Sequence, residues 1–169
     1  MRGKNFFKLG LIYFLGIIYL ALPGPVIPEL YSSLRSVEPG DTWQFPGIWA
    51  YYTDLSRYQV VDFFTKAYSK SWLWELPLPV VKLNHPPEYC REKVRDTQWF
   101  TYCEELINPL KESLFVGGWT PKEDEYYLKI TKKPAADLII EGKVYKTKVI
   151  LKHTESPIWA RILVWTGIW

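Results

Sequence analysis

The chain has 169 residues, of which 17% are aromatic, and it carries a formal net charge of +3. This length is enough for one domain with a hydrophobic core, while so small a net charge gives no argument for a nucleic-acid partner. Nine Trp, twelve Tyr and eight Phe supply apolar area for a core, a membrane interface or ligand stacking. We therefore expect one globular domain and no nucleic-acid binding.

The N-terminal segment has the pattern of a membrane anchor. No charged residue occurs from Leu9 to Ile27, and Arg2, Lys4 and Lys8 precede this run. A helix of about 19 uncharged residues can cross a hydrocarbon core, and basic residues flank such helices on the cytoplasmic side. Residues 1–28 are predicted to be a cytoplasmic basic tip and a transmembrane signal anchor, with the remaining chain outside the cytoplasm.

Two alternatives to an anchor stay open, namely a cleaved signal peptide and a buried helix of a soluble protein. Signal cleavage needs small residues in an A-x-A-like pattern, whereas Ala21 and Gly24 are the only small residues near the end of the apolar run. Pro23, Pro25 and Pro28 would end the helix, because proline lacks an amide hydrogen. The poor cleavage site favours the uncleaved anchor.

A tether, a helix and an extended segment are predicted next. Residues 29–40 are polar and rich in turn-forming types, which is typical of a tether, and residues 41–169 are predicted to form the extracytoplasmic domain. A helix is predicted from Asp54 or Ser56 to Lys70. Its apolar residues recur at helical spacing: Tyr58, Val61, Phe64, Ala67 and Tyr68. Residues 72–83 contain two prolines and are predicted to be extended, at best as an edge strand.

A second helix is predicted to begin at Asn84 or His85, because the two prolines that follow fit a first helical turn. Apolar residues continue at helical spacing as far as Ile107. On one continuous helix, Cys90 and Cys103 would be separated by a rise of about 20 Å and could not pair. Two alternatives remain for them, buried apolar packing and an intermolecular disulfide. A metal site is disfavoured because the chain has no C-x-x-C motif.

The second half of the chain is predicted to be helical as far as Val116 and to alternate from Trp119 onward. Leu110–Val116 is predicted to be a kinked continuation or a second short helix. Tyr126–Ile130 is predicted to be a strand, and Asp137–Ile140 with Val144–Leu151 a hairpin around an intervening Glu-Gly pair. One face of the last strand is expected to lie in the core, and the other, which carries Lys146, Lys148, Ile150 and Lys152, in water.

The end of the chain is apolar and rich in tryptophan. Ser156-Pro157 predicts a helix start, and Arg161 is the only charge from Ile158 to Trp169. This segment is too short to span a bilayer, so it is either buried on the domain core or placed at a membrane interface. Burial is favoured because low charge does not suit a water-facing side. The candidate interface residues are Trp159, Trp165 and Trp169.

No group of residues specifies a reaction. His85 is expected to cap a helix, and His153 lies beside Ser156, which is better explained as a helix cap. Glu104-Glu105 would point to different sides of a helix, and Glu123-Asp124-Glu125 lies in an expected surface turn without EF-hand spacing. The sequence therefore predicts no catalytic residue, no metal and no cofactor.

Two sets of residues are candidates for binding. Aromatic residues near the membrane or in the extended segment could bind a partner: Trp43, Phe45, Trp49, Tyr51, Trp72 and Trp74. Lysines concentrate in the second half: Lys129, Lys132, Lys133, Lys143, Lys146, Lys148 and Lys152. These lysines could contact anionic headgroups or an acidic polymer, but protection of an exposed sheet edge is the favoured explanation.

Two stretches carry a resemblance. Asn84 to Tyr89 reads NHPPEY, and Glu104 to Trp119 reads EELINPLKESLFVGGW. This pattern resembles one in uncharacterised single-span proteins of candidate-phylum bacteria, and the similarity covers the domain from about Asn84 to the Ser156-Pro157 turn. The resemblance brings no known activity with it and implies a bacterial cell envelope.

The patterns together predict an α+β fold, in which one N-terminal transmembrane helix precedes two or three helices packed on a small antiparallel sheet. We expect a membrane-anchored, non-catalytic cell-envelope protein that binds or assembles with a partner. The expected partners are membrane lipid, through the N-terminal helix, and a protein or envelope polymer, with a homo-oligomer as a further option. The alternatives are an envelope hydrolase, with carboxylates and a histidine brought together by the fold, and a glycan-binding module.

Overall fold

A six-stranded antiparallel sheet, in the order β1-β2-β8-β5-β4-β3, forms the centre of the computed structural model, which describes residues 2–42 and 44–168. Its strands are β1 Ser33–Arg35, β2 Ile48–Thr53, β3 Val81–His85, β4 Tyr102–Asn108, β5 Glu112–Trp119 and β8 Thr147–Glu155. A separate hairpin pairs β6, Leu138–Ile140, with β7, Lys143–Tyr145. The helices are α1 Arg2–Ala21, α2 Arg57–Tyr68, α3 Pro87–Lys93, α4 Glu125–Thr131 and α5 Ile158–Ile168, with short 3-10 turns η1 Pro39–Asp41 and η2 Pro121–Glu123.

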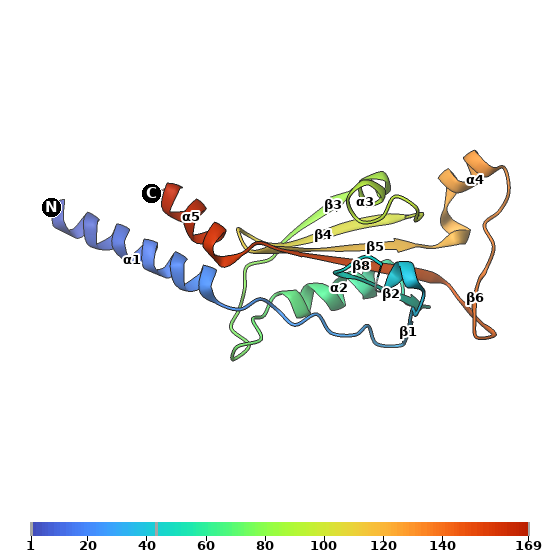
Figure 1. Cartoon of the computed structure of the whole chain (residues 1–169), viewed down its shortest axis with the longest axis horizontal. Helices are drawn as coiled ribbons and strands as arrows, with labels where there is room; N and C mark the ends of the chain where they lie inside the picture. Colours follow the sequence, from blue (N-terminus) through green and yellow to red (C-terminus); the bar gives the residue numbers. More distant parts are fainter. Residues whose placement is uncertain (1, 43, 169) are drawn as a thin grey trace.

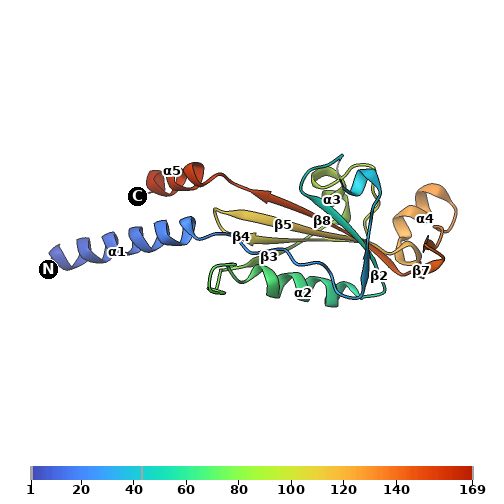
Figure 2. The same ribbon diagram turned by 60° about the horizontal axis from the view of Figure 1, so that its bottom comes forward.

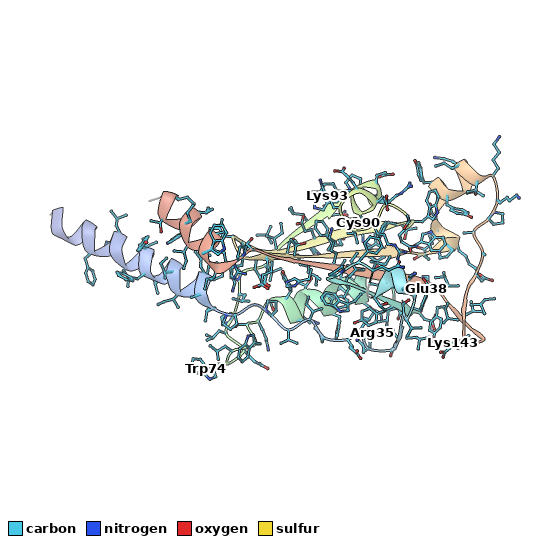
Figure 3. All side chains as sticks on the ribbon, viewed as in Figure 1. Arg35, Glu38, Trp74, Cys90, Lys93 and Lys143 are labelled. Atoms are coloured by element: carbon cyan, nitrogen blue, oxygen red, sulfur yellow. A yellow bond between two sulfur atoms is a disulfide. The ribbon has the colours of Figure 1, made fainter. Side chains whose placement is uncertain are left out.

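The molecule is elongated, with different elements at its two ends. α2 covers one face of the sheet and α3 the other (Figures 1 and 2). α1 and α5, which we call the stem, project together from one end of the sheet. η2, α4 and the β6–β7 hairpin, residues 121–146, form the opposite end, which we call the tip. Figure 3 places Lys143 of the hairpin at that end.

Each face of the sheet has its own hydrophobic core. On one face, Val60 and Phe64 of α2 pack among buried residues of the central strands, including Leu106 and Leu151. On the other face, Cys90 of α3 belongs to the smaller buried cluster. Burial on both faces explains why apolar residues occupy consecutive positions within central strands, as in Leu114–Val116 of β5 and Val149–Leu151 of β8.

The helix predicted from Asp54 or Ser56 to Lys70 is confirmed as α2. Ser56 caps it, because its side chain accepts a hydrogen bond from the amide of Gln59, while the Gln59 side chain accepts one from the amide of Ser56. This reciprocal capping box uses residues three positions apart, so the sequence alone could indicate it.

The helix predicted to run as far as Ile107 is wrong over most of its length. α3 ends at Lys93, and Tyr102–Asn108 forms β4. Leu110–Val116, predicted to be helical, lies mainly in β5, which pairs with both β4 and β8. A short apolar run cannot be assigned to helix or strand by periodicity alone, and the long-range pairing decides the outcome here.

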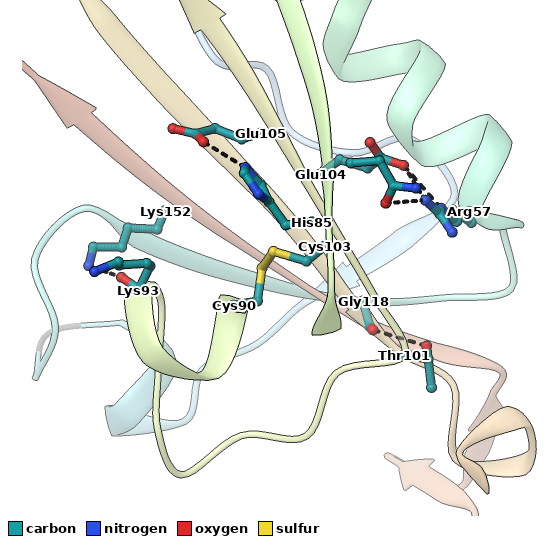
Figure 4. Close-up of a disulfide and its surroundings, with 11 residues drawn as sticks. Arg57, His85, Cys90, Lys93, Thr101, Cys103, Glu104, Glu105, Gly118 and Lys152 are labelled. Carbon is teal, nitrogen blue, oxygen red and sulfur yellow. Dashed lines mark hydrogen bonds and ion pairs between the residues drawn. A yellow bond between two sulfur atoms is a disulfide. The ribbon is translucent and has the colours of Figure 1, made fainter. Parts of the chain in front are cut away.

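The two cysteines form an intramolecular disulfide, against the expectation that they cannot pair. The Cα atoms of Cys90 and Cys103 lie 5.7 Å apart. Figure 4 shows the bond between α3 and β4. That expectation assumed one continuous helix, whereas the chain ends α3 at Lys93 and returns across the sheet as β4. The disulfide therefore fixes the short helix α3 on its face of the sheet.

Two predictions for the second half are also wrong. Tyr126–Ile130 lies in the helix α4 and not in a strand, because Asp124 caps that helix by accepting a hydrogen bond from the amide of Tyr127. β8 is buried on both faces over residues 147–151, because η1 and α3 cover the face that carries Lys148 and Ile150. The hairpin around Glu141-Gly142 is confirmed as β6–β7, while Thr147–Glu155 joins the main sheet.

The transmembrane anchor predicted over residues 1–28 is wrong. Over the ranges that the structure describes, no helix combines the length and the apolarity needed to cross a membrane. The three basic residues of this segment lie within α1, and the helix ends at Ala21. Its uncharged part, Leu9–Ala21, has only 13 residues. Such a helix is about 20 Å long, against a hydrocarbon core of about 30 Å. The predicted single-pass topology is therefore not supported.

Other segments differ from expectation in smaller ways. Residues 29–40, predicted to be a tether, contain β1, which pairs with β2. The predicted edge strand is confirmed as β3, although it begins only at Val81. The predicted C-terminal helix is confirmed as α5, but it packs on α1 and not on the domain core.

Candidate functional site

The stem exposes large apolar side chains on several sides. The most exposed are between 64% and 75% accessible: Phe7, Phe14, Trp159, Leu163 and Ile168. On α1 the exposed apolar residues do not form one stripe, since they occupy neighbouring as well as helically spaced positions: Phe7, Leu9, Leu11, Ile12, Phe14, Leu15 and Ile18. A helix that is apolar on most sides is typical of apolar surroundings and not of water.

The two helices of the stem are joined by specific contacts. The indole Nε1 of Trp165 donates a hydrogen bond to the carbonyl oxygen of Tyr13, at 3.2 Å. The hydroxyls of Tyr13 and Thr166 also lie 3.2 Å apart. A Cβ atom at Gly16 would lie 2.2 Å from the Trp165 ring, so glycine is required for this close approach. The predicted interface residue Trp165 is thus part of the helix pair, whereas Trp159 is exposed and Trp169 lies outside the described residues.

The base of the stem, which we call the neck, is bonded to the turn between β4 and β5. Lys111 of that turn is almost fully buried and donates a hydrogen bond to the carbonyl oxygen of Leu22, at 2.7 Å. The Tyr19 hydroxyl donates to the carbonyl oxygen of Pro109, at 2.9 Å. Burial lowers the pKa of the Lys111 amine, and burial together with the charge of Glu112 raises the pKa of Tyr19 to about 12. The neck is therefore a buried polar joint.

Each histidine pairs with a glutamate of a neighbouring strand. The Nε2 atom of His85 lies 2.9 Å from Oε2 of Glu105, as Figure 4 shows, and His85 belongs to β3 and does not cap a helix. The Nε2 atom of His153 lies 2.9 Å from Oε2 of Glu112. A histidine held by a carboxylate is an arrangement that general-base catalysis uses, so the fold does form pairs of the kind that a hydrolase needs.

Cavities lie away from both histidines. One of about 350 Å³ lies between the β6–β7 hairpin and the sheet, and one of about 590 Å³ lies beside α4. Two smaller ones, of about 230 Å³ and 340 Å³, lie between α3 and α4 and beside α2. His85 and His153 line none of these four cavities. The paired histidines therefore lack an adjoining substrate site among these cavities.

The candidate carboxylates have separate structural partners. Glu104 forms an ion pair with Arg57 of α2, and Glu105 bonds His85 on the other face of the sheet. Asp124 caps α4 and accepts a hydrogen bond from Nε1 of Trp119, at 2.9 Å. Within residues 2–42 and 44–168, no group of three or more His, Cys, Asp or Glu side chains could hold a metal ion.

The aromatic residues considered for binding do not form one surface. Tyr51 is buried in the core beneath α2, and Trp49 packs against that core. The Phe45 ring is partly exposed, with the Arg95 guanidinium 5.6 Å from its centre. Trp43 lies outside the described residues.

Trp72 and Trp74 are both exposed, but they lie in a turn after α2. Trp74 has a φ angle of +53°, and Figure 3 shows its side chain projecting from the molecule. The same-side spacing expected for an extended chain therefore does not apply to this pair.

A buried ion cluster, which the sequence analysis missed, fixes η1 to the sheet. The carboxylate of Asp41 accepts hydrogen bonds from Lys148 Nζ, at 2.7 Å, and from Ser36 Oγ, at 2.6 Å, and it pairs with Arg95. Burial alone would raise the pKa of Asp41, but the bonds from Lys148 and Ser36 and the charge of Arg95 outweigh burial and lower that pKa. Because Lys148 and Arg95 come from distant segments, no local pattern could indicate the ion cluster.

Comparisons of the chain with protein-family models, with curated proteins and with solved structures find no match. The resemblance to single-span envelope proteins is neither supported nor contradicted by these comparisons and stays a prediction. Arguments about function therefore depend on the surfaces of the molecule itself.

Proposed function

We propose that the chain is a non-catalytic protein whose stem contacts lipid and holds the sheet domain beside it, where the domain binds or assembles with a partner. The exposed apolar side chains on several sides of the stem carry this proposal. The uncharged helical part of α1 has 13 residues and α5 has 11, so both are shorter than the roughly 20 apolar residues that a spanning helix needs. The proposal is one of contact with a lipid layer and not of a span across it.

Contact with lipid explains the exposed apolar side chains of the stem better than packing against one partner helix does. A packed helix covers one stripe of its neighbour, whereas the exposed apolar residues of α1 lie on several sides. Trp159, which is exposed on α5, is a residue type favoured at the boundary between lipid and water. Arg2, Lys4 and Lys8, at the start of the chain, suit contact with anionic headgroups.

The disulfide supports a position of the sheet domain outside the cytoplasm. Disulfides persist in oxidising compartments and are rare where thiols are kept reduced. The bond between Cys90 and Cys103 joins two packed elements of the domain. We therefore assign the domain to an oxidising compartment such as the cell envelope.

Flotation with lipid vesicles tests the proposed function. The full chain is mixed with vesicles of phosphatidylcholine and phosphatidylglycerol and centrifuged through a density gradient. Each buried Phe side chain contributes about 2 kcal/mol, so Phe7→Ser with Phe14→Ser should weaken vesicle binding by more than about tenfold. Tyr58→Ser on α2 is the matched control, because Tyr58 is 78% exposed and lies outside the stem.

Two results would overturn the lipid proposal. One is recovery of the unaltered chain at the bottom of the gradient, without vesicles. The other is self-association in lipid-free detergent that disappears in the Phe7→Ser, Phe14→Ser variant, because the stem would then be a contact between copies of the chain. The two histidine–glutamate pairs are the observation that supports the alternative of a hydrolase. If that alternative is correct, cells that carry His85→Ala or His153→Ala should lose the phenotype that the unaltered protein confers.

A further inference from the structure

The outer edge of β3 has no partner strand in the described part of the chain. β3 is the last strand in the order of the main sheet and pairs only with β4. Among the described strands with an open edge, β3 is the longest, because it has five residues, whereas β1, β6 and β7 have three each. Outside the strand ladders, no described group forms a hydrogen bond with the backbone of Val81–Asn84. The outward-pointing backbone groups of β3 are therefore left to solvent.

Neighbouring side chains of β3 point to opposite faces of the sheet. Lys82 and Asn84 lie on the face of α2, where Nη2 of Arg57 donates a hydrogen bond to Oδ1 of Asn84, at 2.9 Å. Val81 and Leu83 lie on the face of α3 and are 45% and 40% exposed. Lysine and proline commonly protect open edges, and in β3 only Lys82 is of these types. On the face of α3, two exposed apolar side chains therefore lie along an unprotected edge.

A groove of about 340 Å³ lies between α2 and β3. The formal charges along it balance, because Arg57 and Lys82 are matched by Asp62 and Glu104. The Glu104 side chain is only 6% exposed, and one of its carboxylate oxygens pairs with Arg57 (Figure 4). Its other oxygen, Oε2, is buried and has no hydrogen-bond partner among the described residues. A donor that enters the groove could therefore satisfy an acceptor that the fold leaves unpaired.

We propose that β3 binds an extended segment of another protein, which adds to the sheet as a further strand. An extended segment supplies main-chain donors and acceptors at the spacing that an open edge requires. Because strand side chains alternate, apolar side chains of the segment would lie beside Val81 and Leu83, and hydroxyl or amide side chains would enter the groove beside α2. The balanced charge of the groove gives no argument for a charged segment. The proposal adds a surface and a class of partner to the proposed function.

A second copy of the chain fits the edge of β3 less well than another protein does. Two identical edges form a closed symmetric pair when their strands are antiparallel, which turns one molecule by 180° relative to the other. The stem projects from one end of the sheet (Figures 1 and 2), so the two stems of such a pair would point in opposite directions. They could not then lie on the same lipid layer. This choice of partner rests on the proposed lipid contact, whereas pairing along the edge does not.

The test uses the full chain in detergent and a fluorescein-labelled peptide of alternating Thr and Val residues, with binding measured by fluorescence anisotropy. The Thr amides are N-methylated, so the peptide keeps one hydrogen-bonding edge and does not stack into sheets. Val81→Lys with Leu83→Lys should weaken binding by about fivefold or more, because the apolar cross-strand contacts are lost. The matched control is Ile139→Lys with Val144→Lys on the β6–β7 hairpin, which also has exposed apolar side chains and open edges. It should stay within about twofold of the unaltered chain.

Two further measurements separate strand pairing from adhesion to exposed apolar side chains. A peptide that is N-methylated at every residue should not bind, because it has no amide donors. Amide hydrogen exchange should slow in β3 when the first peptide is bound, and it should not change in β6 or β7. Unchanged exchange in β5 and β8 of the Val81→Lys, Leu83→Lys variant serves as the control that this variant is folded.

Any of four results would overturn the proposal. The unaltered chain fails to bind the peptide, the fully methylated peptide binds as tightly as the first one, or binding leaves exchange in β3 unchanged. The fourth is a dimer of the unaltered chain in detergent that the Val81→Lys, Leu83→Lys variant does not form, because a second copy would then occupy the edge. Because no lipid is present, failure here is distinguishable from failure of vesicle flotation.

Discussion

Asp41 connects three segments that are far apart in the sequence, since its carboxylate pairs with Lys148 of β8 and with Arg95 after α3. Removing one member of a buried ion pair leaves the opposite charge uncompensated. We expect Asp41→Asn to lower the free energy of unfolding by about 3 kcal/mol, measured by urea denaturation with tryptophan fluorescence. Asp62→Asn, which breaks the exposed pair with Lys66, should leave the denaturation midpoint unchanged.

The lowered pKa of Asp41 predicts how the free energy of unfolding depends on pH. Its pKa is lower in the folded chain than its ordinary value of about 3.9. Its contribution to stability is therefore complete above that value and is lost as the pH falls through the lower folded pKa. On acidification below about pH 4, the unaltered chain should lose more stability than Asp41→Asn. Equal losses in the two proteins would show that Asp41 is not responsible.

Single residues were predictable where their partners are close in sequence. The start of α2 was predicted at Asp54 or Ser56, and the spacing of Ser56 and Gln59, which form the cap within one turn, is a local signal for Ser56. Lys148 was assigned to a wet strand face, because the residues that bury it, Asp41 above all, are far away in the chain. A long-range ion pair leaves no signal in a single sequence.

At the scale of elements, the disulfide matters most for α3, which has only seven residues. A helix this short depends on tertiary contacts, and the bond closes a loop with a sequence separation of 13 between Cys90 and Cys103. Replacing both cysteines with alanine should cost about 3 kcal/mol of unfolding free energy. It should also speed amide hydrogen exchange in α3 to a greater extent than in α2, because local opening of α3 adds to the loss of global stability that both helices share. Equal protection of α3 in both proteins would contradict this expectation.

The β6–β7 hairpin was predicted correctly from the sequence, whereas the strand β4 was not. The β6–β7 hairpin was recognised from the Glu141-Gly142 pair that lies between alternating residues. In the structure both turn residues have positive φ angles. β4 was taken for helix because Tyr102–Asn108 pairs with strands on both sides, and packing covers both of its faces. A strand of this kind lacks the two-residue period that marks a half-buried one.

For the whole molecule, the α+β class is confirmed, but the reason for predicting it, helices before Trp119 and strands after it, is wrong, because β2, β3 and β4 precede that residue and α4 and α5 follow it. The arrangement of the two ends was not predicted. The uncharged run from Leu9 to Ile27 was predicted to form one helix. In the structure α1 ends at Ala21, and residues 22–27 are not helical. The stem also needs α5, from the other end of the chain, and only the fold brings these two helices together. The tip was missed for a related reason, since α4 was taken for a strand.

The neck determines how the two ends of the molecule move relative to each other. α5 follows β8 after only two residues, and β8 lies inside the sheet between β2 and β5. Lys111 and Tyr19 attach α1 to the turn that joins β4 to β5. Tilting the stem therefore has to displace three inner strands and not a loose edge. The stem and the sheet should therefore move as one stiff body, and under the lipid contact proposed above the angle of the stem would set the height of the tip over the lipid.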